Sequence, residues 1–351
     1  MLLVYRNVTS GKDLAIITFF QEMIDSIIVD ESMFEEAFIL ERFGCRDSQI
    51  KEIARSLSPA RQGHAITNLF VHGPPGIGKT VVCKWILKEH FPRHSVYVNC
   101  WSVRTSHKIL AEILVSLGYV VHGRESTSEL VKKLGKLGKR LIICLDEFDY
   151  LKDKEKDILY DLLRNSCGII LISNSAYALS TVDSRVKSSL LVNEIEFRPY
   201  SREDIKSILK ERISFGLRSG SMSDGLLSII ATMSGGDARM GLQTIKVAAK
   251  EAEAKGKPTL SIEEVRNAAK FARKYKLSYL LGKLNDHQKL VYEILKKNRR
   301  MDSGKLFDEY CRATKDPVVD RAYRNHMERM LELGLVRSAG SGRWKKYEIV
   351  S

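Results

Sequence analysis

The sequence has few cysteines, and their spacing fits neither a metal site nor a disulfide framework. Its 351 residues include six cysteines, and no two of them form a C-x-x-C pair. Scattered cysteines in a chain of this size are typical of a reducing compartment, so we expect free thiols rather than bridges. Cys83 and Cys144 fall inside predicted regular elements, where we expect them to be buried.

Long hydrophobic runs, internal repeats and low-complexity linkers are also missing. The N-terminal stretch LAIITFF, residues 14–20, is seven residues long and follows Lys12 and Asp13. A membrane-spanning helix needs about 20 apolar residues, and the stretch lacks the cleavage site of a signal peptide. We interpret it as a buried helix segment, and we expect a cytoplasmic protein without a membrane partner.

Negative charge is in deficit. The chain has 57 Lys and Arg against 43 Asp and Glu, a formal net charge of +14, and its isoelectric point is near 9.4. Such an excess suggests a polyanionic partner, with nucleic acid first and an anionic membrane surface second. The alternative is a solvated basic surface.

Short apolar runs alternate with helical patterns in the first part of the chain. Runs of this kind predict a parallel sheet covered by helices on both faces, which is an α/β architecture. The five runs are ITNLFVH (66–72), SVYVNC (95–100), LIICLD (141–146), GIILIS (168–173) and VNEIEF (192–197).

The strands stop after Pro199, and two further patterns follow. The first contains four predicted helices, at 201–214, 223–234, 237–254 and 261–275, where Ser261 and Glu264 form a capping box. The second has helices near 286–298, 302–313 and 318–333, then Gly334 and a basic hairpin, which describes a winged helix-turn-helix. We therefore expect three domains: an α/β domain at 1–199 with an extension at 1–27, a helical lid at 200–280, and a winged-helix domain at 281–351.

A phosphate-binding motif lies between a predicted strand and a predicted helix. HGPPGIGKT, residues 72–80, fits G-x-x-x-x-G-K-[ST]. Its glycines allow a tight turn that points N–H groups at phosphate oxygens. Lys79 supplies a charge for the β- and γ-phosphates, and Thr80 supplies a hydroxyl for Mg²⁺. We predict a nucleotide site formed by Gly76, Ile77, Gly78, Lys79 and Thr80.

A pair of carboxylates ends the third predicted strand, in LIICLDEFD, residues 141–149. Asp146 can hold Mg²⁺, and Glu147 can polarise the attacking water as a general base. An acidic pair is a weak signal alone, because acidic residues cap many helices. On a later strand of the sheet that carries the phosphate loop, however, the pair predicts an ATPase.

Three more polar residues follow in the order of an ATP site. Asn174 comes just after the fourth predicted strand and can hold the water or the γ-phosphate, although such an Asn is commonly a turn former. Arg185 precedes the last strand, and Arg239 opens a helix of the second domain, from where it can reach a γ-phosphate. For either arginine, the alternative is a solvated helix face.

This ordered set resembles the AAA+ ATPases, and in detail the archaeal replication initiators, which are relatives of the largest origin-recognition-complex subunit and of the cell-division-control-six helicase loader. The resemblance extends from about residue 28 to the C-terminus. Residues 1 to about 27 have no counterpart in it, and we expect translation to begin at Met23 or Met33. The segments that resemble the family are FILERFGCRDSQIKEIARSL (38–57), RVKSSL (185–190), EIEFRPY (194–200) and GGDARMGL (235–242).

The resemblance implies roles for single residues around ATP or ADP and Mg²⁺. It makes Asn174 the first sensor and Arg239 the second. It makes Arg185 the arginine that reaches a neighbouring subunit's nucleotide, or its own. Tyr200 and Arg212, twelve residues apart across the first lid helix, match a pair that contacts the nucleotide.

The resemblance also implies double-stranded DNA as a partner. In the third helix, 318–336, an apolar stripe of Met327, Met330 and Leu331 faces the core, and four residues are expected to point outward toward bases or phosphates. In the wing, GSGRWKKYEI (340–349), three cations lie beside the tip, and Trp344 either wedges against sugar or packs the wing. The candidate DNA contacts are Arg321, Arg324, Asn325 and Arg329 in the helix, and Arg343, Lys345 and Lys346 in the wing.

The strength and extent of DNA contact leave alternatives open. Residues 285–351 contain 15 Lys and Arg against 10 Asp and Glu, a net charge of +5 that predicts partial neutralisation of phosphates. The alternative is a winged helix used for protein contacts. A helical insertion at about 99–125 offers a second contact through Arg104, His107, Lys108 and Arg124, or is simply an amphipathic crossover helix.

The resulting expectation is a slowly hydrolysing ATPase that recognises origin DNA at the nucleoid and helps to recruit or load the replicative helicase, alongside paralogous initiators. One alternative is a signalling or transcriptional ATPase that joins the same nucleotide domain to a winged helix. Another is a paralogue that binds ATP without useful hydrolysis.

Overall fold

The computed structural model describes residues 26–35, 38, 44–137, 141–165, 167–340 and 342–350. They divide into two compact units. The smaller contains those up to Phe38 together with Tyr200–Lys276, and the larger contains those between Phe38 and Tyr200 together with those from Leu277 onward. The segment 14–20 and the candidate start Met23 lie outside the described residues. The predicted domain boundaries at 200 and 281 stay predictions.

A parallel five-stranded sheet, in the order β2-β3-β4-β1-β5, forms the centre of the larger unit. All five predicted strands are confirmed, to within two residues at each end. Their bounds are β1 Asn68–His72, β2 Ser95–Asn99, β3 Ile142–Asp146, β4 Gly168–Ser173 and β5 Val192–Glu196.

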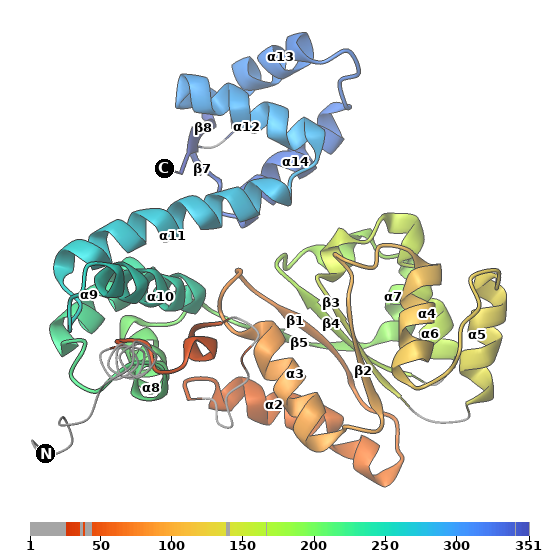
Figure 1. Ribbon diagram of the computed structural model, residues 1–351. Helices are drawn as coiled ribbons and strands as arrows, with labels where there is room; N and C mark the ends of the chain where they lie inside the picture. The colour runs from red at the N-terminus through yellow and green to blue at the C-terminus, as the bar shows by residue number, and fades with distance from the viewer. Residues whose placement is uncertain are drawn as a thin grey trace, which may run out of the picture. The chain divides into compact units, whose positions relative to one another are not determined.

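Helices bury the middle of this sheet from both sides, as continuous apolar strands require. Phe70 and Leu145 join the core formed with α4 (Ser106–Ser116), α5 (Thr127–Lys136), α6 (Ile158–Arg164) and α7 (Ser184–Leu190). The alternate residues Leu69 and Val71 are also fully buried, and α2 (Asp47–Leu57) and α3 (Lys79–His90) pack against the sheet (Figure 1). Cys83 and Cys144 are buried free thiols, as predicted.

The C-terminal part of the larger unit has the elements of a winged helix-turn-helix. Helices α12 (Asp286–Asn298), α13 (Ser303–Ala313) and α14 (Asp320–Glu332) precede the hairpin of β7 (Val336–Ala339) and β8 (Lys346–Ile349). Gly334, at φ +68°, ends α14 in the left-handed conformation that glycine tolerates best. An additional strand, β6 (Arg300–Asp302), pairs with β8 and was not predicted.

The smaller unit contains the predicted helical lid. Its helices are α8 (Arg202–Gly216), α9 (Asp224–Met233), α10 (Ala238–Ala254) and the first part of α11 (Ile262–Gly282). Helix α11 continues beyond the predicted end at residue 275, and its last turns belong to the larger unit. Among the described residues, no helix is both long and apolar enough to cross a membrane.

Glu264 anchors the start of α11 and predicts a pH-dependent contribution to stability. Its side chain is fully buried, accepts hydrogen bonds from Ser261 N–H at 3.1 Å and from Lys257 Nζ at 2.6 Å, and pairs with Lys255. The hydrogen bonds from Lys257 and Ser261 outweigh burial and lower its pKa from 4.5. Because the charged form is favoured in the folded protein, this contribution is present above pH 4.5 and is lost as the pH falls below it.

We expect Glu264→Gln to lower the free energy of unfolding at pH 7 by about 1–3 kcal/mol, because a buried charge-assisted network loses its anion. The matched control is Glu263→Gln, whose side chain is 68% exposed and lies 3.9 Å from Lys255. Urea unfolding at pH 7 and pH 3 measures both. A difference between Glu264→Gln and the wild type that persists undiminished at pH 3 would contradict the assignment.

Candidate nucleotide site

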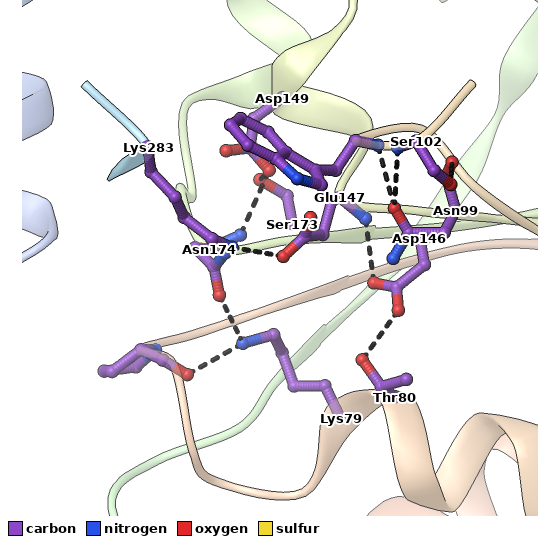
Figure 2. Close-up of polar contacts among 12 residues, drawn as sticks. Lys79, Thr80, Asn99, Ser102, Asp146, Glu147, Asp149, Ser173, Asn174 and Lys283 are labelled. Atoms are coloured by element: carbon purple, nitrogen blue, oxygen red, sulfur yellow. Dashed lines mark hydrogen bonds and ion pairs between the residues drawn. The ribbon is translucent and has the colours of Figure 1, made fainter. Parts of the chain in front are cut away.

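The strand order brings the candidate site residues to one edge of the sheet. The phosphate loop follows β1, Asn174 follows β4, and Asp146 ends β3, and β4 lies between β1 and β3. Since the strands are parallel, their carboxyl ends meet at the same edge. Figure 2 shows the result, with Lys79 reaching Asn174 and Thr80 pointing at Asp146.

The phosphate loop is wound so tightly that it needs glycine. At Gly73, φ is +143°, and a Cβ would lie 2.1 Å from the backbone oxygen of Phe197. Gly76 and Gly78 also have positive φ values, +82° and +90°. This backbone directs N–H groups into the loop, as anion binding requires.

Lys79 lies nearly buried above this loop, with 6% of its surface exposed. Its Nζ donates hydrogen bonds to Gly73 O at 2.6 Å, to Pro74 O at 2.7 Å and to Asn174 Oδ1 at 3.0 Å. These three oxygens are uncharged, so a phosphate would be a stronger partner for the ammonium. The residues therefore fit a nucleotide phosphate.

Asp146, 3% exposed, is held by three donors. Thr80 Oγ1 and the Tyr97 hydroxyl both donate to its Oδ2 at 2.7 Å, and Glu147 N–H donates to Oδ1 at 2.8 Å. Burial, and then the charge of Asp146, raise the pKa of Tyr97, so its hydroxyl remains a donor. Tyr97 is a positioning residue that the sequence reasoning missed.

Thr80 and Asp146 fit Mg²⁺ rather than a metal bound by protein alone. Mg²⁺ is typically bound through one or two carboxylates together with substrate phosphates. Among the described residues, there is no group of three or more His, Cys, Asp or Glu side chains that could hold a metal. One carboxylate and one hydroxyl beside a phosphate loop match the first arrangement.

Glu147 sits in a strained backbone conformation. Its φ is +54°, which is uncommon for any residue other than glycine, and such conformations cluster at functional sites. Its side chain is 15% exposed, and its Oε1 accepts a hydrogen bond from Lys283 Nζ (Figure 2). The candidate base is therefore paired with a cation that the sequence reasoning did not consider.

Two further residues organise the site and were also missed. Asp149 Oδ1 accepts hydrogen bonds from Ser173 Oγ at 2.9 Å and from Asn174 N–H at 3.3 Å, so it connects the segment after the third strand to Asn174. Arg46, 5% exposed, donates to Ile77 O at 3.0 Å and so supports the phosphate loop. Asp149 stands in the LDEFD segment and Arg46 stands just before α2, but neither belongs to a sequence motif that would indicate its role.

The other nucleotide candidates lie apart from this cluster or in the smaller unit. Arg185 begins α7, has a side chain that is 88% exposed, and pairs with Asp183 at 3.2 Å. In the smaller unit, Tyr200 N–H donates to Gly236 O at 3.3 Å, and Arg212 donates to Met33 O and Phe38 O, both at 3.1 Å. Arg239 in that unit pairs with Asp237 at 3.8 Å. Their roles toward a nucleotide stay predictions.

Helix α14 presents three of its four candidate DNA residues to solvent, namely Arg321, Arg324 and Asn325. The prediction that Arg329 points outward is wrong. Its side chain is 16% exposed, and its Nη2 lies 2.5 Å from Asp149 Oδ2. Asp149 is a buried carboxylate far away in sequence, so helical periodicity could not reveal this pairing.

The wing has a mixed outcome. Trp344 is 78% exposed, so it does not pack the wing. Lys346 lies 3.3 Å from Asp302, and the Lys345 ammonium lies 5.2 Å from the Tyr347 ring. The side chain of Arg343 is outside the described part of the chain.

The segment 99–125 contains a crossover helix with an exposed basic side. Ile109 and Ile113 of α4 are fully buried in the core of the sheet. Arg104 stacks at 4.1 Å over the ring of Trp101, and Arg104 and Lys108 are both exposed. The amphipathic crossover is confirmed, and DNA contact by these two residues stays a prediction.

The fold and this site define an AAA+ ATPase with a helical lid and a C-terminal winged helix. The sequence matches the AAA domain family over residues 64–175 and the Cdc6 AAA+ ATPase-type lid domain over residues 206–270. It is 32% identical to the ORC1-type DNA replication protein 1 of Sulfurisphaera tokodaii, across 90% of this chain and 87% of that protein. The chain belongs to the family of ORC1-type DNA replication proteins.

Solved structures agree with this assignment. The Aeropyrum pernix ORC1 protein, solved in complex with DNA, matches with a TM-score of 0.71 and 26% identity, over 92% of this chain and 93% of that one. Cdc6p from Pyrobaculum aerophilum matches with a TM-score of 0.65 and 23% identity, over 92% and 94%. The second likeness concerns the fold alone.

We expect Lys79→Ala to weaken ATP binding at least about tenfold, because a phosphate then loses its nearly buried cation. Lys88→Ala, an exposed position near the end of the same helix, is the matched control and should bind as the wild type does. Isothermal titration with ATP and Mg²⁺ measures both affinities. Equal affinity of Lys79→Ala and the wild type would contradict the assignment.

Proposed function

We propose that this protein is an ATP-regulated initiator of DNA replication that binds origin DNA through its winged helix. The observation that carries the proposal is the cluster of Lys79, Thr80 and Asp146 in the same compact unit as the exposed polar face of α14. The first feature fits a nucleotide and Mg²⁺, and the second fits DNA.

In the nucleotide reaction, Gly76, Ile77 and Gly78 hold the phosphates, while Lys79 and Thr80 orient the β- and γ-phosphates and Mg²⁺. Water attacks the γ-phosphorus, the bond to the bridging oxygen of ADP breaks, and the proton of the water passes to Glu147. Asn174 would orient the water, and Thr80 and Asp146 would hold Mg²⁺, which would neutralise charge on the phosphates. The family resemblance also assigns contacts with the nucleotide to Arg185, Arg239, Tyr200 and Arg212.

Slow hydrolysis suits a switch rather than a motor. Oε1 of Glu147 already accepts a hydrogen bond from Lys283, and a base paired with a cation removes a proton less readily. ATP and ADP therefore mark two states of the protein, and the ATP state persists long enough to act on DNA.

On DNA, helix α14 would enter the major groove with Arg321, Arg324 and Asn325, and the wing would follow phosphates with Lys345, Lys346 and Arg343. Arg104, just before α4, and Lys108, within α4, would add further contacts with DNA phosphates. The bound initiator would then help to recruit the replicative helicase, together with paralogous initiators. The lid at 200–280 would couple nucleotide state to these partners.

The proposal is tested by incubating the protein with sheared genomic DNA of its own organism at ~150 mM salt and sequencing what it retains. We expect a few discrete sites, occupied more strongly with ATP than with ADP. Uniform retention that disappears as salt is raised would reduce the DNA activity to non-specific attraction of phosphates by the net charge of +14.

At a site found in this way, we expect Arg321→Ala to weaken binding by about 1–3 kcal/mol if it reads a base edge. The matched control is Lys296→Ala on α12, whose side chain is 60% exposed. Fluorescence anisotropy with the specific duplex and with a scrambled one separates loss of specificity from loss of charge. An equal effect of both variants would contradict base reading by α14.

A further inference from the structure

Two cations of the C-terminal part meet two carboxylates of the nucleotide site, all within the larger unit. Lys283 Nζ donates a hydrogen bond to Glu147 Oε1, and Arg329 Nη2 lies 2.5 Å from Asp149 Oδ2. A third contact joins the same surfaces, since Ser175 Oγ donates to Glu332 Oε1 at 2.5 Å. We refer to the Lys283–Glu147 and Arg329–Asp149 pairs together as the latch.

The latch is built into the interior rather than lying on the surface. The side chain of Lys283 is 4% exposed, and those of Asp149 and Arg329 are 6% and 16% exposed. A buried ion pair is strongly disfavoured when one partner leaves, because the other charge is then uncompensated. Breaking one pair alone would therefore leave an uncompensated charge in a nearly buried position.

Aromatic rings surround the Lys283 ammonium. The ring centroids of Tyr279, Tyr150 and Trp101 lie 4.7, 5.1 and 5.9 Å from Nζ. Arg329 lies 5.1 Å from the same Tyr150 ring. Cations over aromatic faces are attracted by the ring quadrupole, most strongly where water is excluded.

Both cations stay charged in this environment. Burial lowers the pKa of Lys283, but Tyr150 and the hydrogen bonds of Glu147 and Tyr279 more than offset it, so the pKa is raised. Burial also lowers the pKa of Arg329, but Asp149, Tyr150 and Glu332 together more than offset it, so the pKa of Arg329 is raised as well. Lys283 therefore engages Oε1 of Glu147 as a cation, and Arg329 lies as a cation beside Asp149.

We propose that this latch is an autoinhibitory contact, in which Lys283 withholds Glu147 from hydrolysis and Arg329 is withheld from DNA, so that DNA binding and hydrolysis require the same open state. The inference rests on the proposed function, because it takes Glu147 as the base and α14 as the DNA-reading helix. While Lys283 engages Oε1 of Glu147, that oxygen is not available to the attacking water. Arg329 cannot contact a phosphate while it pairs with Asp149.

The arrangement also says how DNA opens the latch. Arg321, Arg324 and Asn325 on α14 are exposed with the latch closed, so DNA can engage them first. A DNA phosphate can then replace Asp149 as the partner of Arg329, which offsets the free-energy cost of opening the latch. If a nucleotide stabilises the open state, it must raise the affinity for DNA. The factor is the same as the one by which DNA raises the affinity for that nucleotide.

The first test is single-turnover hydrolysis of bound ATP without DNA. Lys283→Met keeps an unbranched side chain in the aromatic surroundings but removes the charge, and should raise the rate at least about fivefold while ATP affinity changes less than about twofold. Lys283→Arg keeps the cation and should stay near the wild-type rate. Lys289→Met, at a side chain that is 51% exposed, is the matched control and should change nothing.

The outcomes separate the latch from the proposed function. If the wild type binds ATP and Lys283→Met hydrolyses it no faster, or more slowly, the latch is overturned and the nucleotide site stands. If Glu147→Gln in the Lys283→Met background is as fast as Lys283→Met alone, Glu147 is not the base and the proposed mechanism fails with the latch. If the wild type binds no ATP, both fail.

A second variant keeps the test valid if Lys283→Met does not fold. Arg329→Gln breaks the Asp149 pair and the 3.4 Å contact with Glu332, and leaves the Lys283–Glu147 pair in place. It should raise the basal rate and abolish stimulation by a 30-bp duplex carrying a retained site, whereas the wild type is stimulated. Trp101 gives a structural readout in a Trp85→Phe, Trp344→Phe background, because opening removes Lys283 from its ring. A Trp101 emission spectrum that bound duplex leaves unchanged would overturn the proposal.

Discussion

The carboxyl edge of one parallel sheet concentrates charge, and the rest of the structure depends on how that charge is neutralised. Asp146 is the last residue of β3, and Glu147 and Asp149 follow it. Asp146 and the side chain of Asp149 are almost inaccessible to water. Buried carboxylates need donors or cations. Thr80 and Tyr97 donate hydrogen bonds to Asp146. Lys283 pairs with Glu147, and Arg329 pairs with Asp149. The nucleotide site is therefore completed, in this structure, by the C-terminal part of the chain.

This arrangement links the two activities that we propose. ATP and Mg²⁺ bring their own charges to the sheet edge, and DNA brings phosphates to α14. In the proposed open state, a ligand charge takes the place of a charge that the protein supplies in the closed latch. Each ligand therefore changes the free energy of opening, and so the affinity for the other ligand. Under the proposal, slow hydrolysis would follow from the pairing of Glu147 with Lys283 and would not require a defective motif.

The sequence allowed the sheet, the lid helices, the wing and the phosphate loop to be predicted, because these depend on local periodicity, glycine and short motifs. It did not reveal β6, the length of α11, or the environment of Arg329. Each of these is decided by contacts with distant residues, as when Arg329 meets Asp149 or β6 pairs with β8. Lys283 and Asp149 were missed for the same reason, since neither stands in a motif that periodicity or spacing would single out.

The central claim, that this chain initiates replication, is tested most directly in living cells. Chromatin immunoprecipitation of the protein and mapping of nascent-strand start sites in the same culture give two sets of positions. The account predicts that the strongest binding sites coincide with replication starts, and that Lys79→Ala removes firing at those starts. Binding confined to promoters, with every replication start unaffected by the substitution, would contradict it and favour a transcriptional ATPase.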